Sequence, residues 1–362
     1  MVIGAVRSAA PAAAVIAVAC AVLFGSVLRH PHYTPDGMVY ARYAAHDAGY
    51  SEHDAALSVR HAYEHTPLMN RPRYRELVEI DPDTAFARSA IFSNRILYSA
   101  VAAVLYPAAG VRALFIVSAI SYAAFALCLY WLLASFGRPW AAAVLSVIGL
   151  LLPKSRAAAA SDLTDMFALV WWTLALVAIV RGTRDSRPRW AVLLAGASIL
   201  LTLTRPVPYL TILPALAAGI AAGAWPLLAG AAASVAAFLA VALLTHAFGV
   251  AEQLRWVYVH RPDAAGSTIG EGAWYRRALA ATLAYGFVEG IRAIWPAAGL
   301  GAWIYALRIP AARTDAIVIG AAGLAVLLAV PFNPVPSALD RVVFLPLVPL
   351  ACAAAACALR AV

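Results

Sequence analysis

The stretch HPHYTPDGMVYARYAAHD, residues 30–47, places one carboxylate where it could do chemistry. Asp36 follows the first apolar run, at a boundary between membrane and water, between Pro35 and Gly37. A carboxylate at such a boundary is costly unless it is used. It could be a general base that takes a proton from a hydroxyl, or a metal ligand. The competing interpretation is a helix cap, because Pro-Asp-Gly is typical of turns that start a helix.

A second group of charges lies in the segment LLPKSRAAAASDLTD. Lys154 and Arg156 follow one apolar run, and their cations could bind a lipid phosphate or reach toward lipid headgroups as interfacial anchors. Asp162 and Asp165 open the next run. Ser161 or Asp162 could cap the helix there, and an acid in the first turn favours the helix dipole. Capping explains one of the two acids well and the other less well.

Further charges stand at the ends of later apolar runs. Arg205 lies in LTLTRPVPYL, where Pro206 and Pro208 break the run. A phosphate contact and an interfacial anchor explain Arg205 equally well. Asp340 and Arg341 open the last run, in PFNPVPSALDRVVFLPLVPL. They could form a local ion pair, or the aspartate could hold the arginine toward a phosphate.

The histidines give weaker signals. The segment from His61 to His65, HAYEH, matches the inverted zinc-protease string H-x-x-E-H, but no third ligand stands in context. We do not favour a metalloprotease, because such short strings match often by chance. His30 and His32 are interpreted as interfacial. We assign no metal site and no certain cofactor, although the outer carboxylates could bind a divalent cation.

Membrane helices must position these residues. Of the 362 residues, 64% are hydrophobic and only 12% are charged, about half the charged fraction of a soluble domain, which is roughly 25%. This composition predicts an all-α polytopic protein whose residues 1–362 form a single membrane domain. The net charge is +9, but the arginines are scattered between apolar runs. Nucleic acid is therefore not an expected partner.

Charge decides the topology. The segment 89–108 is apolar but is interrupted by Asn94 and Arg95. If this segment does not span, the short arginine-rich loops all fall on the side of the termini, which obeys the positive-inside rule. We therefore predict about ten transmembrane helices in the cell membrane, with both termini cytoplasmic. The predicted spans are residues 11–28, 112–135, 140–153, 163–181, 190–204, 207–223, 226–247, 284–307, 315–331 and 342–359.

The same topology places two polar segments outside the cell. Residues 29–110 form a long first extracytoplasmic loop with juxtamembrane helices, and residues 248–283 form a second one. All the candidate residues then face one aqueous compartment, where they can share a site. These residues are Asp36, Lys154, Arg156, Asp162, Asp165, Arg205, Glu271, Asp340 and Arg341.

In order and sidedness, these features resemble the C-type glycosyltransferase (GT-C) superfamily of polytopic membrane enzymes, which use polyprenyl-phosphate-linked sugars. An acid follows the first helix in TPDGMVYARYA, and the first outer loop ends in FSNRILYSAVAAVLYP, similar to an R-x-L-x-P segment. LLPKSRAAAASDLTD joins two later spans. DRVVFLPLVPL is similar to the R-[YF]-x-x-P-x-x-P pattern. The likeness covers most of the chain.

The resemblance implies an inverting transferase. Asp36 would be the base that deprotonates or orients the acceptor, and Asp162 or Asp165 the second outer acid. The partners would be a polyprenyl-phosphate sugar donor, an acceptor hydroxyl on a lipid, glycan or protein, and membrane lipids. The chain departs from many members in having Gly37, not a second acid, after Asp36, and in being shorter. The candidates to hold the lipid phosphate are Arg95, Lys154, Arg156, Arg205 and Arg341.

Two other functions compete with an enzyme. A transporter or flippase of a lipid-linked glycan would carry polar residues at midmembrane, or interrupted helices in two similar halves. Here the charges gather at one face and no internal repeat is found, which favours the enzyme. A non-catalytic subunit of an envelope assembly is the third hypothesis, and it predicts that replacing Asp36 with alanine is silent.

Overall fold

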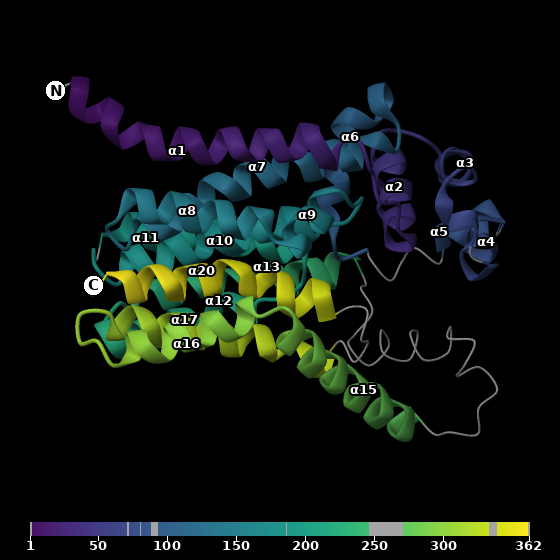
Figure 1. Cartoon of the computed structure of the whole chain (residues 1–362). Coiled ribbons are helices and arrows are strands. Elements are labelled where there is room, and N and C mark those ends of the chain that lie inside the picture. The colour runs from purple at the N-terminus through teal and green to yellow at the C-terminus, as the bar shows by residue number, and fades with distance from the viewer. Residues whose placement is uncertain are drawn as a thin grey trace.

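The computed structural model describes residues 2–70, 72–79, 81–87, 93–185, 187–245, 271–332 and 339–360. Helices make up most of this described part, and it contains no strand, only one backbone bridge between His32 and Ser161. The all-α prediction is confirmed. Figure 1 shows the helices packed side by side as a bundle, with both termini at one end.

Within the described residues, five helical stretches are long and apolar enough to cross a membrane, so the chain has the character of a helical membrane protein. A sixth is added if α8 and α9, which meet at a 66° bend, are counted as one span. The five are α7 (Arg112–Ala134), α10 (Asp165–Gly182), α13 (Pro226–Thr245), α17 (Arg313–Leu327) with its continuation to Pro331, and the last stretch, Asp340–Leu359. The bent pair is α8 (Pro139–Leu151) and α9 (Pro153–Ala159).

The prediction of ten spans is not confirmed, because several predicted runs form shorter helices. α12 has 14 residues and α16 has 13, which at 1.5 Å per residue gives roughly 20 Å, less than the roughly 30 Å hydrocarbon core. The predicted span 284–307 is divided by a break at Ile294. The shorter or divided helices are the apolar stretch Ala9–Gly25, which contains most of α1 (Val2–Val22), and α11 (Pro188–Thr204), α12 (Tyr209–Ala222), α15 (Glu271–Arg292) and α16 (Trp295–Leu307).

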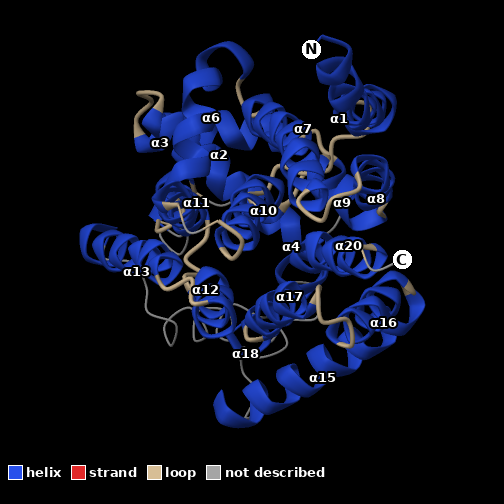
Figure 2. Cartoon of the chain, turned by 90° about the vertical axis from the view of Figure 1, so that its left-hand side faces the viewer, coloured by secondary structure: helices blue, strands red, loops and turns tan. Residues whose placement is uncertain are grey.

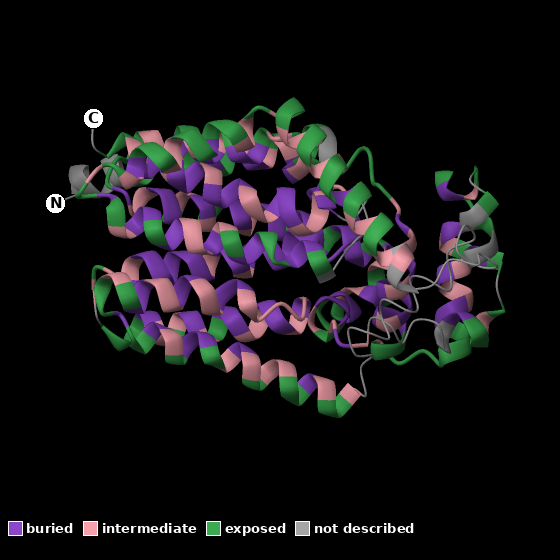
Figure 3. Ribbon diagram, turned by 90° about the horizontal axis from the view of Figure 1, so that it is seen from below, coloured by how far each residue is buried: buried purple, intermediate pink, exposed green. Residues whose placement is uncertain are grey.

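The core of the bundle forms around α10, which is the most buried of the spanning helices. Trp172 of α10 packs with Phe125 and Leu129 of α7 and with Val348 of α20 (Leu345–Leu359) in one apolar cluster. Figure 2 looks along the helices and shows α10 enclosed by α7, α11, α9 and α20. Figure 3 shows the buried residues on the facing sides of the helices, while α15 is largely half-buried or exposed.

Short helices cover the end of the bundle opposite the termini (Figure 1). α6 belongs to this end: Tyr98 near its start packs on Tyr40 of α2, and Tyr106 near its end packs on Tyr50 and bonds to Ser58 of α3. α6 has 14 residues and is not among the stretches long enough to cross a membrane. Residues 88–92 of this segment lie outside the described part. The short helices are α2 (Pro35–Asp47), α3 (Glu52–Tyr63), α4 (Pro72–Glu79), α5 (Pro82–Ala87) and α6 (Ile96–Ala109), with a 3-10 turn at Pro67–Asn70.

The arginine-rich loops converge at the end that holds the termini. Asp315, in the first turn of α17, pairs with Arg184 after α10 and with Arg360 at the end of α20. The loops that the charge pattern placed on one side of the membrane therefore do meet at one end of the bundle. Of the second polar segment, 248–283, residues 248–270 lie outside the described part.

Candidate functional site

The site begins at the start of α2. Thr34 is the N-cap of this helix, and its Oγ1 accepts a hydrogen bond from the backbone N–H of Gly37 at 2.9 Å. Thr34 therefore does the capping that sequence reasoning offered to Asp36. The Asp36 side chain, in the first turn of α2, points instead toward Arg341.

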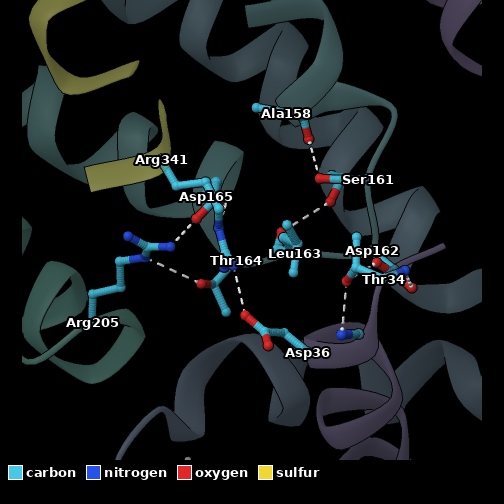
Figure 4. A network of polar contacts seen from close by, with 12 residues as sticks. Thr34, Asp36, Ala158, Ser161, Asp162, Leu163, Thr164, Asp165, Arg205 and Arg341 are labelled. Carbon is cyan, nitrogen blue, oxygen red and sulfur yellow. Dashed lines mark hydrogen bonds and ion pairs between the residues drawn. The ribbon is translucent and has the colours of Figure 1, made fainter. Parts of the chain in front are cut away.

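Arg341 bridges two carboxylates that come from different helices (Figure 4). Its Nη1 donates to Oδ2 of Asp36 at 2.6 Å, and its Nε donates to Oδ2 of Asp165 at 2.6 Å. Arg341 lies in a π-helical turn, Asp340–Phe344, that leads into α20, and Asp165 is the first residue of α10. One guanidinium thus joins the first polar loop, α10 and the last helix.

Arg205 completes what we call the arginine–aspartate cluster: Asp36, Asp165, Arg205 and Arg341. Arg205, just after α11, pairs with Oδ1 of Asp165 and donates from Nε to Thr164 Oγ1 at 3.3 Å. Asp165 therefore lies between two arginines, and its side chain is 2% exposed. The Asp36 side chain is 34% exposed. Asp36 is thus the carboxylate of the cluster that a substrate can reach.

The charges in and beside the cluster favour an added anion. Burial by itself would raise the pKa of Asp36, but Arg341, with Arg95 and Arg205, outweighs burial and holds that pKa below its ordinary value. Burial, followed by repulsion from Arg341 and Arg95, lowers the pKa of the Arg205 guanidinium to about 9. The arginines repel one another, and an anion with phosphate chemistry would reduce that repulsion.

A small cavity of about 50 Å³ adjoins the cluster. Asp165, Arg205 and Arg341 form its polar side, and apolar side chains such as Trp172 and Leu210 form the rest. The cavity lies where α10, α11, α12 and α20 meet. Cations therefore stand at the head of an apolar space, which is smaller than the roughly 300 Å³ of the smallest usual ligand pockets and would have to widen to admit a ligand.

Asp162 has a different position from the one expected of a catalytic acid. Its side chain is fully buried and accepts hydrogen bonds from the backbone N–H and Oγ1 of Thr34, at 3.1 and 2.7 Å, and from the Tyr63 hydroxyl. Burial raises the pKa of Asp162 to about 6, although the hydrogen bonds from Tyr63 and Thr34 act against this rise. Asp162 therefore fastens the starts of α2 and α10 and the end of α3 together, and it forms no ion pair with the described arginines.

Gly37 is required by this contact. A Cβ placed on Gly37 would lie 2.0 Å from Cγ of Asp162, far closer than carbon atoms approach. The Asp36–Gly37 sequence, which departs from a paired-acid pattern, therefore has a local steric cause. The second acid of the site, Asp165, comes from α10.

The other predicted phosphate-binding residues lie at different distances from the cluster. Arg95 is the N-cap of α6, and its Nη1 donates to the hydroxyl of Tyr40, one turn along α2 from Asp36, at 2.6 Å. Arg95 thus flanks the cluster. Arg156 is exposed on α9.

Lys154 and Asp340 form a separate ion pair. Lys154 Nζ lies 2.6 Å from Oδ1 of Asp340, and Tyr285 of α15 donates its hydroxyl to Oδ2 of Asp340 at 3.3 Å. Asp340 therefore pairs with Lys154 rather than with its neighbour Arg341, so the local Asp340–Arg341 pair that the sequence allowed is not formed. The side chain of Glu271, a further outer acid, lies outside the described residues.

The described residues do not offer a metal site. They include no group of three or more His, Cys, Asp or Glu side chains placed to hold an ion. α3 ends at Tyr63, so His61 and His65 do not share a helix face, and both lie beside Glu64 with largely exposed rings. Between the two carboxylates of the cluster, the guanidinium of Arg341 takes the position that a bridging cation would need.

Sequence reasoning missed two supporting residues. Thr34 directly precedes Pro-Asp-Gly, and a threonine before a helix-starting proline is a capping signal that was readable. Tyr40 stands four residues after Asp36, hence on the same face of α2, a spacing that was also readable.

The chain was compared with protein-family models, with curated proteins and with solved structures, and none of them matches.

Proposed function

We propose that this protein is a membrane glycosyltransferase of the GT-C type. It moves a sugar from a polyprenyl-phosphate donor to a hydroxyl of a lipid, glycan or protein on the extracytoplasmic side of the cell membrane, with both termini cytoplasmic. The observation that carries the proposal is the Arg341 guanidinium, held between Asp36 and Asp165 beside Arg205 at the mouth of an apolar cavity.

The reaction assigns a part to each group of the cluster. The acceptor oxygen attacks the anomeric carbon, and the bond from that carbon to the phosphate oxygen breaks with inversion. The hydroxyl proton goes to the carboxylate of Asp36, and the electron pair of the broken bond goes to the polyprenyl phosphate. Arg341 and Arg205 stabilise the negative charge that grows on the leaving phosphate, and preplaced cations are most effective in such a water-poor site.

The resting ion pair gives the donor a way to activate the base. While Arg341 is bonded to Asp36, the carboxylate is a weak base, because its pKa is held below the ordinary value. A donor phosphate competes with Asp36 for the same guanidinium. Once Arg341 turns to the phosphate, Asp36 loses its strongest stabilising partner and becomes more basic. Proton removal would then follow donor binding rather than precede it.

The test is sugar transfer by the purified protein in lipid, with a panel of radiolabelled polyprenyl-phosphate sugars and a membrane extract as acceptor. Asp36→Asn should abolish transfer, since the amide cannot accept the proton. Donor binding should be kept or strengthened, since the amide competes less with the phosphate for Arg341. Asp83→Asn is the matched control, because Asp83 is an exposed acid on α5 whose described partner is His53.

The outcomes separate the competing functions. Loss of transfer in Asp36→Asn alone supports the transferase. Donor binding without transfer by the wild type points to a flippase of a lipid-linked glycan or to a missing partner subunit. If no donor binds, the proposal fails and the cluster is a structural device that closes the bundle.

A further inference from the structure

A second, larger cavity lies at the opposite end of the bundle from the cluster. Figure 2 views the molecule from this end, where the termini lie. Its volume is about 280 Å³, and it opens between the end of α7, the end of α10 and the start of α11. Nothing in the proposed transfer reaction uses it. We call it the arginine–tryptophan pocket, and its lining residues are Ala134, Ser135, Arg181, Arg184, Asp185, Arg189 and Trp190.

Neighbouring side chains fix the guanidinium of Arg181 in this pocket. Its guanidinium carbon lies 5.3 Å from the ring centre of Trp131 and 5.7 Å from that of Trp190, so it stacks with both indoles. Its Nε donates to Oγ of Ser135 at 3.0 Å. In the described part of the chain Arg181 forms no ion pair with a carboxylate. A fixed guanidinium whose charge is not balanced by a carboxylate is suited to receive an anion.

The carboxylates near the pocket already form ion pairs with other arginines. Asp185 is paired with Arg189 at 2.8 Å and with Arg187 at 3.3 Å, and it accepts a hydrogen bond from Nε1 of Trp190 at 3.2 Å. Arg184 is paired with Asp315, outside the lining. Three arginines line the pocket against one aspartate, so the lining carries excess positive charge.

The position of the pocket along the helices matches that of a lipid headgroup. It lies at the ends of membrane helices, where tryptophan is typical of the interface between hydrocarbon and water. Trp140, in the first turn of the neighbouring α8, is 62% exposed, and Val192 of α11, just beyond Trp190, is 70% exposed. Exposed apolar side chains beside a cationic pocket indicate that acyl chains lie next to the pocket opening.

We propose that the arginine–tryptophan pocket binds the phosphate of an anionic phospholipid headgroup. Arg181 and Arg189 contact the phosphate oxygens, the indoles of Trp131 and Trp190 keep Arg181 in place, and the acyl chains lie along the exposed face of α11. The inference does not depend on the proposed transferase activity. The same arginines also satisfy the positive-inside rule, which requires the charges but neither the stacking nor the cavity.

The experiment measures lipid binding by the full-length protein in neutral detergent. Native mass spectrometry counts retained phosphatidylglycerol, and thermal unfolding measures the stabilisation it causes, with phosphatidylcholine and soluble glycerol phosphate as separate probes. We expect phosphatidylglycerol alone to be retained and to raise the unfolding midpoint. Arg181→Gln with Arg189→Gln should weaken its binding about thirtyfold, since each basic residue at an anionic surface contributes roughly a fivefold factor.

Two further variants make the result decisive. Arg308→Gln removes an exposed arginine at the same end of the bundle but outside the pocket, and it should retain wild-type binding. Arg189→Gln alone alters an exposed side chain, so it folds normally and should weaken binding several-fold. The proposal is overturned if Arg308→Gln loses as much binding as Arg189→Gln, or if phosphatidylcholine binds as well as phosphatidylglycerol. It is also overturned if glycerol phosphate gives the full stabilisation, because the pocket would then belong to a soluble anion.

Discussion

Arg341 and Asp36 stand 305 positions apart in the chain, yet Nη1 of the arginine donates to Oδ2 of the aspartate at 2.6 Å. The same guanidinium reaches Asp165 through its Nε. This bridge links the start of α2 to the starts of α10 and α20, so it both closes the polar end of the bundle and forms the candidate site. Substitutions at the bridge separate these two roles.

Replacing Arg341 tests the bridge. Arg341→Lys keeps the charge, but a single ammonium cannot reproduce two hydrogen bonds from a planar fork. We expect it to lower the free energy of unfolding by about 2 kcal/mol and to weaken donor binding about tenfold or more. Chemical unfolding in detergent and donor titration measure the two effects. Arg308→Lys, far from the cluster, should change neither, and wild-type behaviour of Arg341→Lys would show that only the charge matters.

Substitutions of Arg205 and of Lys154 should differ in their effect on donor affinity, although the sequence suggested that both residues hold the phosphate. Arg205 lines the cavity and pairs with Asp165, whereas Lys154 is paired with Asp340. Arg205→Gln should reduce donor affinity about tenfold or more, because it removes a charge-assisted contact. Lys154→Gln should change that affinity by less than about threefold and cost less than about 1 kcal/mol of stability, as partly exposed pairs do. Equal losses of donor affinity would place Lys154 in the site.

Gly37→Ala should destabilise the protein through a clash with Asp162. The added methyl group would lie 2.0 Å from the Asp162 carboxyl carbon, so the start of α2 must move. Overpacking of this kind costs about 1–3 kcal/mol. Gly196→Ala is the control, because its Cβ meets no atom within 4 Å, and the change should be neutral or slightly stabilising. When Asp162→Ala is combined with Gly37→Ala, part of the clash should be relieved, so the two losses of unfolding free energy should not add fully. Full additivity of the two losses would contradict the clash.

Asp162 should make stability fall as the pH rises. Burial raises its pKa from the ordinary 3.8 to about 6, so the folded protein binds a proton that the unfolded chain releases. The cost of ionising it is absent below pH 4, grows between pH 4 and 6, and is complete above pH 6. The difference in unfolding free energy between wild type and Asp162→Asn should shift by roughly 2–3 kcal/mol across that window. A constant difference across the window would contradict a raised pKa.

The pH dependence of stability that comes from Asp36 has the opposite sign. Because its pKa is lowered in the folded protein, its contribution to stability is present above pH 4 and is lost as the pH falls further. The difference in unfolding free energy between wild type and Asp36→Asn should therefore be constant between pH 5 and 8 and shrink below pH 4. Measurements from pH 3 to 8 distinguish the two aspartates, and a change above pH 5 would contradict the Arg341 pair.

Some of this protein follows directly from its sequence. The apolar runs determine helices, because backbone groups in hydrocarbon must be bonded within their own segment. The choice of Asp36, Asp165, Arg205 and Arg341 as candidates followed from charged types at the ends of apolar runs, and these four do meet in the structure. The number of spanning helices did not follow, because Arg292 and Pro296, which flank the break at Ile294, can also stand in a spanning helix that is only kinked there.

Only the tertiary structure decided which charges pair. The sequence alone left three alternatives open: Asp36 as a helix cap, Asp340 paired with Arg341, and Asp162 and Asp165 in equivalent roles. Packing brings Arg341 to Asp36 and Asp165, turns Asp340 to Lys154, and buries Asp162 against Gly37. The physical reason is that an ion pair depends on distance in space and on how deeply each partner is buried. Both are set by helices far apart in the chain, and sequence spacing encodes neither.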